Sequence, residues 1–201
     1  MADRLQFVAT RLLTRRGMVW LALAAALALP AEIWPGAAGE TPSLEGQVKA
    51  AFLAKLAMFV EWPAGTFADA AAPICIGILG EDPFGSYLDE VARQERVNGR
   101  SLQTRRVRDL AGLQGCHIVF VSPSESARLP QVLQALEQRP VLTVGDEASF
   151  AQRGGIVSFI KASGKVGFAV NLDAARQAGM KLSAKFLQVA KVLPHGGVGT
   201  L

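Results

Sequence analysis

Residues 74–79 read ICIGIL, an apolar run that no polar side chain interrupts. A strand with one solvated face alternates apolar and polar residues, whereas a continuous apolar run is typical of a strand buried on both faces of a sheet. Helices then pack on those two faces. The stretch therefore predicts the central strand of an α/β domain.

The segments around this strand alternate between helix and strand patterns. Upstream, apolar residues recur at three- and four-residue steps from 44 to 60, which predicts an amphipathic helix with Ser43 as its N-cap. Downstream, the turn dipeptide Asn98-Gly99 precedes a strand that runs to about Arg106. The other predicted elements up to residue 144 are helix 86–94, a short helical turn at 109–113, strand 117–121, helix 124–136 and strand 141–144. This order predicts a mostly parallel or mixed sheet that is flanked by helices.

The last part of the chain has a different pattern. Two apolar runs, 156–160 and 166–170, flank a short turn that contains Ser163-Gly164, and this arrangement predicts an antiparallel hairpin. Two further helices are predicted at 172–178 and 183–192. The predicted single domain, its flexible lead and its flexible tail are residues 44–193, 39–43 and 194–201.

The N-terminal segment has the pattern of an export signal. Arginines up to Arg16 precede an uncharged apolar run at 17–31, as in the basic and hydrophobic regions of a signal peptide. The run is shorter than the roughly 20 residues that a helix needs to cross a bilayer. We predict a signal peptide over residues 1–38, cleaved after about Ala31 or Ala38, with an uncleaved tether as the alternative. The mature protein is then periplasmic and does not span the membrane, whether it is exported by the general or by the twin-arginine route.

The charge of the predicted mature chain argues against a nucleic-acid partner. The whole chain has a net charge of +4, but residues 1–38 contain four Arg and two acidic residues. Their removal leaves 17 basic and 15 acidic groups and a net charge of +2. A nucleic-acid-binding domain is usually strongly basic, so we expect none of that activity.

Motifs for catalysis, metals or cofactors are missing from the sequence. The loop at 80–85 has the spacing of phosphate-loop glycines, but it lacks the lysine and carries the acidic Glu81 and Asp82. His117 and His195 lack the spacing of metal ligands. We therefore expect a protein that is not an enzyme and holds no metal or cofactor. A hydrolase or redox enzyme that uses His117 or a free Cys116 is a competing hypothesis.

The chain has two cysteines, Cys75 and Cys116. An exported protein meets an oxidising compartment, so a disulfide between them is the expected state. The alternative is two separate buried thiols that act as small apolar residues.

Two short segments are candidates for binding a partner. The first is Phe59, Glu61 and Trp62, at the predicted end of the first helix, where two large aromatic side chains flank a carboxylate. Aromatic residues are enriched in binding hot spots, although both rings could instead pack the helix onto the sheet. The second is Arg153, which precedes two glycines and could bind an anion or cap a helix.

Seven segments follow one another with a recognisable order and spacing: KAAFLAKLAMFVEWP (49–63), ICIGILGEDPFG (74–85), VNGR (97–100), CHIVFVS (116–122), RPVLTVGD (139–146), FAQRGGIVSFI (150–160) and VNLDAARQAGMKLSAKFLQVA (170–190). Together, over residues 47–192, they resemble the YfiR family of periplasmic proteins. Any one of them is a weak signal, whereas the series is specific to the family.

The resemblance implies a compact α/β domain, often a homodimer, in the periplasm of Gram-negative bacteria. The best-known members of the family bind the periplasmic part of an inner-membrane diguanylate cyclase and repress it, which keeps cyclic-di-GMP signalling and biofilm formation low. An outer-membrane lipoprotein can sequester the repressor. The resemblance also implies that Cys75 and Cys116 pair. A second cysteine pair that some relatives carry near the stretch corresponding to 146–155 is missing from this chain.

A periplasmic binding module for a small molecule, such as a nucleotide or an amino acid, is the alternative function. Parallel sheets bind ligands beyond the carboxyl ends of their strands, which here places the predicted site at 80–85 and 122–124.

Overall fold

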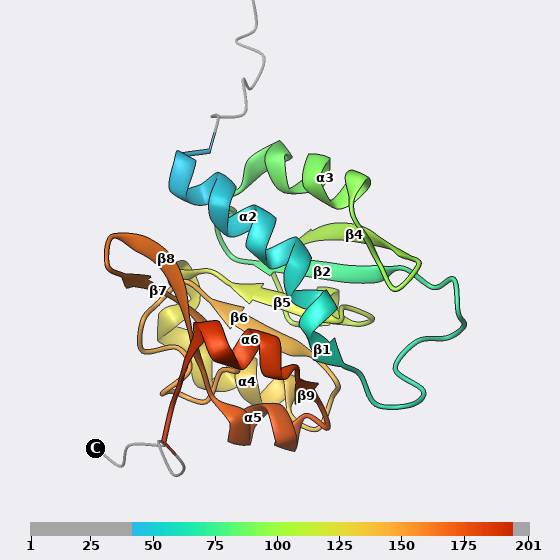
Figure 1. Cartoon of the computed structure of the whole chain (residues 1–201). Coiled ribbons are helices and arrows are strands. Elements are labelled where there is room, and N and C mark those ends of the chain that lie inside the picture. The colour runs from blue at the N-terminus through green and yellow to red at the C-terminus, as the bar shows by residue number, and fades with distance from the viewer. Residues whose placement is uncertain (1–41, 195–201) are drawn as a thin grey trace, which may run out of the picture. The chain divides into compact units, whose positions relative to one another are not determined.

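The ICIGIL run forms strand β2 (Ile74–Leu79), which is buried along its whole length. The structure is a computed structural model that describes residues 42–194 (Figure 1). The predicted signal peptide lies outside the described residues, as do all but residues 42, 43 and 194 of the two predicted flexible ends. On its two sides β2 pairs in parallel with β4 and with β5, so it lies inside the sheet as predicted.

The main sheet of the described chain has eight strands in the order β10-β8-β7-β6-β5-β2-β4-β3. Pairing is parallel except at β3 with β4 and at β7 with β8, so the predicted mostly parallel or mixed sheet is confirmed. The strands are β2 (Ile74–Leu79), β3 (Arg96–Val97), β4 (Arg100–Val107), β5 (Ile118–Val121), β6 (Leu142–Gly145), β7 (Val157–Ala162), β8 (Lys165–Val170) and β10 (Ala190–Val192). A separate antiparallel pair consists of β1 (Val60–Glu61) and β9 (Lys181–Leu182).

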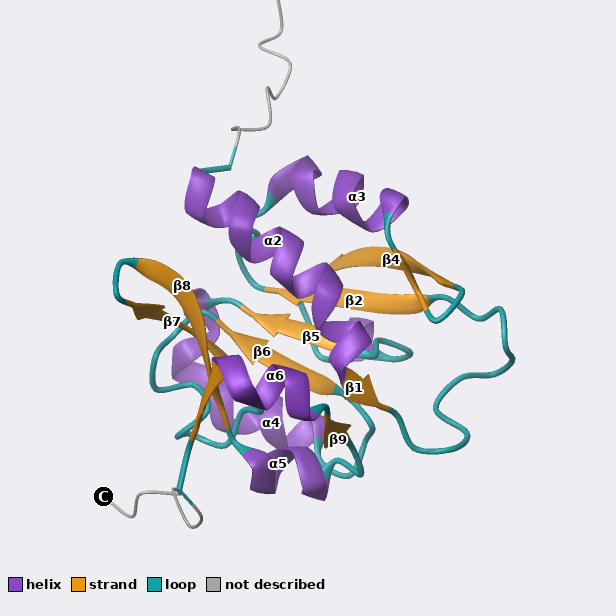
Figure 2. Cartoon of the chain, in the orientation of Figure 1, coloured by secondary structure: helices purple, strands orange, loops and turns teal. Residues whose placement is uncertain are grey.

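Helices cover both faces of this sheet (Figure 2). Helices α2, α3 and α6 pack on one face and share a core with β2, β6, β7 and β8, whereas α4 packs on the other face in a smaller core. The helices are α2 (Leu44–Leu56), α3 (Gly85–Gln94), α4 (Leu129–Leu136), α5 (Leu172–Gln177) and α6 (Ala184–Val189), with short 3-10 helices η2 (Ala57–Phe59), η3 (Ala111–Leu113) and η4 (Pro123–Arg128). In the described part of the chain, no helix is long and apolar enough to span a membrane.

Two hairpin turns form at the predicted dipeptides. Asn98 and Gly99 join β3 to β4, and Ser163 and Gly164 join β7 to β8. All four residues have positive φ, as a two-residue turn of type I′ requires.

The predicted helix over residues 44–60 is shorter than expected. Ser43 caps it as predicted, because Ser43 Oγ accepts a hydrogen bond of 3.1 Å from the backbone N–H of Gly46. The α-helix ends at Leu56, however, and Val60 is already in β1. The helix cannot continue to residue 60 because Val60 and Glu61 are extended and pair as β1 with β9, a strand about 120 residues later in the chain.

The predicted helix over residues 183–192 is also partly wrong. Helix α6 ends at Val189, and Ala190–Val192 form β10, which pairs in parallel with Phe168–Val170 of β8. The backbone of these residues therefore extends the sheet instead of the helix.

Candidate functional site

Phe59 packs into the domain at the amino end of the parallel strands. Its ring stacks on Phe186 of α6, with 5.6 Å between the ring centres. Its backbone carbonyl accepts a hydrogen bond of 2.8 Å from the N–H of Ser183. Phe59 therefore holds η2 against α6, and its ring is only partly exposed.

Trp62 belongs to a different cluster, formed by Trp62, Phe67, Arg100 and His117, which we call the aromatic cluster. The half-buried Trp62 ring lies edge-to-face with Phe67 and with His117, at 5.8 and 6.1 Å between ring centres. Phe67 stacks on His117 at 4.6 Å, and the Arg100 guanidinium carbon lies 4.0 Å from the centre of the Phe67 ring. This contact is a cation–π interaction.

His117 connects the aromatic cluster to the central strand. Its Nδ1 accepts a hydrogen bond of 3.1 Å from the backbone N–H of Cys75. Burial lowers the pKa of His117 and the nearby charge of Arg100 lowers it further, while a hydrogen bond with the backbone of Thr66 opposes the shift. The neutral imidazole is therefore the form that fits this position, because a protonated Nδ1 could not accept the Cys75 N–H.

An open cavity of about 570 Å³ lies in front of the aromatic cluster. Glu61 is exposed, and both Glu61 and Trp62 line this cavity. Its other lining side chains that carry polar or aromatic groups are Thr66, Phe67, Asp69, Asn98 and Arg100. The structure thus brings two predicted site residues, Glu61 and Trp62, to one concave surface.

Arg153 lies at the opposite end of the sheet. Its guanidinium donates to Ser126 Oγ at 2.7 Å and to the Ser126 carbonyl at 2.8 Å, and it forms an ion pair with Glu147 at 3.2 Å. Ser126 and Glu147 follow the carboxyl ends of β5 and β6, whereas His117, beside Trp62, precedes β5. The structure therefore does not bring Arg153 together with Phe59, Glu61 and Trp62, and Arg153 joins two loops.

The expected disulfide is not formed in this structure. Cys75 and Cys116 are free and buried, and their Sγ atoms are 3.2 Å apart, which is a hydrogen-bond contact and well beyond the about 2.05 Å of a disulfide. The two side chains are nevertheless neighbours. The N–H of His117 donates to the Cys75 carbonyl at 2.9 Å, and this bond aligns the start of β5 with β2, so that Cys116 lies beside Cys75. The hydrogen bond from Cys116 lowers the pKa of Cys75 to about 7, and this bond, together with burial, raises the pKa of Cys116.

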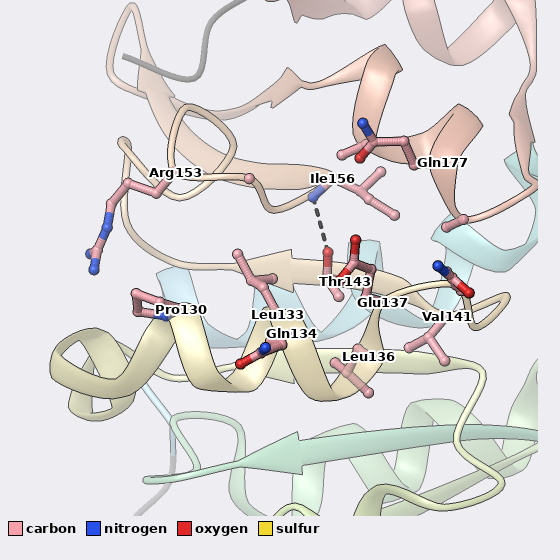
Figure 3. A pocket seen from close by; sticks show the side chains of 14 residues that line it. Pro130, Leu133, Gln134, Leu136, Glu137, Val141, Thr143, Arg153, Ile156 and Gln177 are labelled. Carbon is pink, nitrogen blue, oxygen red and sulfur yellow. Dashed lines mark hydrogen bonds between the residues drawn. The ribbon is translucent and has the colours of Figure 1, made fainter. Parts of the chain in front are cut away.

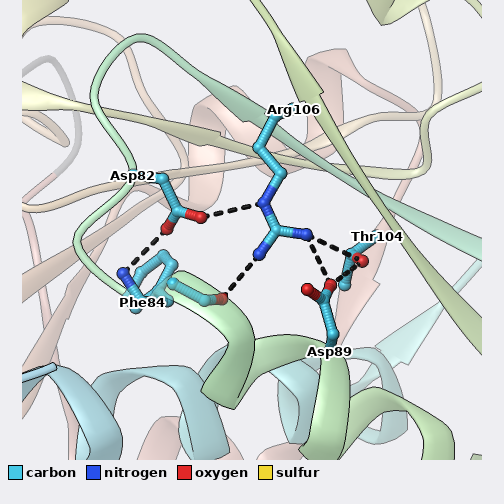
Figure 4. Close-up of polar contacts among 6 residues, drawn as sticks. Asp82, Phe84, Asp89, Thr104 and Arg106 are labelled. Atoms are coloured by element: carbon cyan, nitrogen blue, oxygen red, sulfur yellow. Dashed lines mark hydrogen bonds and ion pairs between the residues drawn. The ribbon is translucent and has the colours of Figure 1, made fainter. Parts of the chain in front are cut away.

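The predicted small-molecule site beyond β2 and β5 is filled by the protein's own side chains. Ser124 Oγ accepts a hydrogen bond of 3.1 Å from the N–H of Glu81, and a Cβ added at Gly80 would lie 2.5 Å from that same oxygen. Asp82 accepts from the N–H of Phe84 at 2.7 Å and pairs with Arg106 at 2.8 Å (Figure 4). The loop at 80–85 is therefore a structural turn that is closed against the loop after β5.

A cavity that sequence reasoning missed lies between α4 and α5 (Figure 3). Its volume is about 330 Å³, at the lower end of the range for small-molecule pockets. Thr143 Oγ1 accepts a hydrogen bond of 3.0 Å from the N–H of Ile156 across the space between β6 and β7. No sequence motif signals the cavity, because its walls come from helices α4 and α5, strand β6 and the loops beside β6 and β7, which span residues 130 to 178. The side chains that line it include Leu133, Gln134, Glu137, Thr143, Arg153, Ile156 and Gln177.

Metal ligands do not gather among residues 42–194: no group of three or more His, Cys, Asp or Glu side chains there could hold an ion.

Comparison with known proteins gives one informative match. A family model described as YfiR/HmsC-like matches residues 46–191, which is most of the described chain. No curated protein matches the sequence. One solved structure that the chain resembles is the ABC domain in complex with L-Trp from Streptococcus pneumonia, at 13% sequence identity and a TM-score of 0.49. The match covers 74% of this chain and only 60% of that one, and a likeness at this level supports no conclusion about function.

Proposed function

Because this chain belongs to the YfiR/HmsC-like family, we propose that it is a periplasmic, non-catalytic regulator that binds and represses an inner-membrane diguanylate cyclase. The family match over residues 46–191 is the observation that carries this proposal. In this role the protein contacts the periplasmic portion of the cyclase and lowers cyclic-di-GMP signalling and biofilm formation. We also propose that it acts as a homodimer and that an outer-membrane lipoprotein can sequester it.

Repression of this kind is stoichiometric binding and needs no bond to be made or broken. The regulator binds the inactive conformation of the cyclase more tightly than the active one, and the shift between them cannot exceed this difference in affinity. We expect one bound copy per cyclase protomer.

Glu61 and Trp62 are our first candidates for the contact with the cyclase. They line one open cavity, and Trp62 offers a large amphipathic side chain that is only half buried. Phe59 lies behind them against Phe186 and supports the same end of the sheet. Arg153 would need a second contact region, because it lies beyond the carboxyl ends of the strands.

The proposal is tested with inner membranes solubilised in detergent and with the mature domain that begins at about Gly39. We expect the domain to retain a diguanylate cyclase, and the cyclase activity to fall as the domain is added, with saturation near equal molar amounts. Retention of no cyclase, or a cyclase activity that does not change with added domain, contradicts the proposal.

A small-molecule binding module is the second candidate, and the cavity between α4 and α5 is the observation that favours it. A ligand that binds only the folded state raises the melting temperature. A thermal-shift screen of nucleotides and amino acids therefore tests it, and a Leu133→Trp variant that fills the cavity is the matched control. A shift in the native domain that is lost in this variant, with no cyclase retained from membranes, would favour the binding module.

A further inference from the structure

Helix α2 has a second apolar stripe that the domain covers only in part. Leu44, Val48 and Phe52 lie at four-residue steps on one side of the helix and are 77%, 37% and 36% exposed. The residues of α2 that face the core are different ones, among them Ala50 and Leu53, which are fully buried. A surface helix normally has one apolar face, so the exposed part of this stripe, greatest at Leu44, is more than packing within the domain requires.

The tip of the β7–β8 hairpin lies beside the start of α2 (Figure 1), and residues of both elements line one cavity. The cavity between them is about 620 Å³. The Phe52 ring lies edge-to-face with the buried Phe168 of β8, at 5.1 Å between ring centres, so the core closes the groove at this point. We call this the α2–hairpin groove, and its residues are Leu44, Glu45, Val48, Phe52, Lys161, Gly164, Lys165 and Val166.

Two lysines, Lys161 and Lys165, line the groove on the hairpin side. Glu45 is the acidic residue of the groove, and it already pairs with Lys49 at 2.6 Å and with Lys161 at 3.3 Å. Lys165 is exposed and forms no ion pair with the other residues that the structure describes.

We propose that the α2–hairpin groove is the docking site for an amphipathic helix of the membrane partner, with acidic residues beside its apolar stripe. The stripe from Leu44 to Phe52 extends about 12 Å along α2, which matches the anchors of two helical turns. A groove with apolar side chains along α2 and with Lys165, unpaired among the described residues, on the hairpin side complements such a helix in shape and in charge. The inference rests on the proposed function only for the identity of the partner.

Site-specific photo-crosslinking tests this inference in the full chain. Val48 is replaced by benzoylphenylalanine, the protein is exported to the periplasm, and the crosslinked segment is sequenced by mass spectrometry after illumination. The same probe at Trp62 reports the aromatic cluster, and at Gln131, which is exposed on α4 on the other face of the sheet, it is the matched control. We expect position 48, and not position 131, to capture an apolar segment with acidic residues from the periplasmic portion of a membrane protein.

The outcomes separate this inference from the proposed function. Capture of a cyclase from position 62 but not from position 48 overturns the groove and leaves the proposed function in place. Capture from position 48 of an acidic amphipathic helix that belongs to another protein supports the groove and contradicts the proposed function. Capture of lipid, of a second copy of this chain, of a segment without acidic residues, or of nothing at position 48 overturns the inference.

The charge of the occupant is tested by reversing the charge of the two lysines that line the groove. The double variant Lys161→Glu with Lys165→Glu should lower the yield of the position-48 crosslink by about tenfold, because like charges then face each other. The double variant Lys185→Glu with Lys191→Glu makes the same change in net charge at exposed positions outside the groove and should keep the yield. Equal yields in the two double variants would overturn an acidic occupant.

Discussion

At the scale of single residues, Trp62 is the side chain most directly tied to the proposed function. Trp62→Ala should weaken binding to the cyclase by about tenfold or more, as is usual for an aromatic hot spot. The measurement is a titration of cyclase activity with each variant. Met58→Ala is the matched control, because Met58 is exposed nearby but does not line the cavity of Glu61 and Trp62. A folded Trp62→Ala domain that represses as well as the native one would remove Trp62 from the contact.

Phe150 shows how tightly the smaller core, on the α4 face of the sheet, is packed. A Cβ added at Gly155 would lie 2.0 Å from its ring, and one added at Gly145 would lie 2.2 Å from it. Gly155→Ala should therefore lower the free energy of unfolding by about 2 kcal/mol or more, because overpacking forces the ring or the backbone to move. Urea denaturation measures the loss.

The matching control for Gly155→Ala is the double variant with Phe150→Leu. A smaller side chain at 150 makes room for the new methyl group, so Gly155→Ala should cost less in that background. Equal costs in the two backgrounds would show that the Phe150 ring is not the cause.

His117 should make the stability of the domain depend on pH. Its pKa is lowered in the folded state, first by burial, so the unfolded chain binds more protons at mildly acidic pH. The free energy of unfolding should fall as the pH drops from above the ordinary value of 6.5 through the lowered pKa of the folded state. His117→Asn keeps an acceptor for the Cys75 N–H but does not titrate. The difference in stability between the native domain and this variant, measured by urea denaturation, should therefore change between pH 7 and pH 5, and a constant difference would contradict the role of His117.

At the scale of secondary-structure elements, the first turn of α2 depends on its cap. Ser43→Ala removes the acceptor for the Gly46 N–H and should lower the free energy of unfolding by about 1 kcal/mol. Ser43→Asp is the control, because aspartate caps equally well, and it should retain the native stability. Because the exposed stripe starts at Leu44, the same loss should weaken crosslinking from position 48.

The edges of the sheet show how elements depend on distant partners. Strands β5 and β6 are predicted from the mainly apolar residues that form them. In contrast, β1 and β10 are strands only because β9 and β8 lie beside them. A short segment such as Ala190–Val192 has no pattern of its own that distinguishes a strand from the end of a helix.

At the scale of the whole molecule, the domain from Gly39 should unfold as one unit. Trp62 is the one tryptophan of the chain after residue 38, so its fluorescence reports the amino end of the sheet. Circular dichroism in the far ultraviolet reports all helices and strands. The two thermal transitions should coincide, as in a small two-state domain, and separate midpoints would show that the aromatic cluster unfolds on its own.

The proposed contact regions lie at different ends and on different faces of the domain. Trp62 lies at the amino end of the strands, Arg153 beyond their carboxyl ends, and the α2–hairpin groove on the face opposite α4. A membrane partner that meets both Trp62 and the groove must run along α2, which joins the two regions.

The sequence alone determined the central strand, the hairpin turns at Asn98-Gly99 and Ser163-Gly164, the cap at Ser43, the mixed sheet with its helices and the family. These features depend on local patterns of apolar residues, turn residues and short motifs, which a single chain displays in order. Only the tertiary structure decided that Glu61 and Trp62 share a cavity while Arg153 lies at the opposite end of the sheet, that Cys75 and Cys116 are neighbouring free thiols, and that the stripe of α2 is left partly exposed. Each of these depends on which distant segments pack together, because contacts between remote residues are set by the packing of the whole domain and not by the residues beside them in the chain.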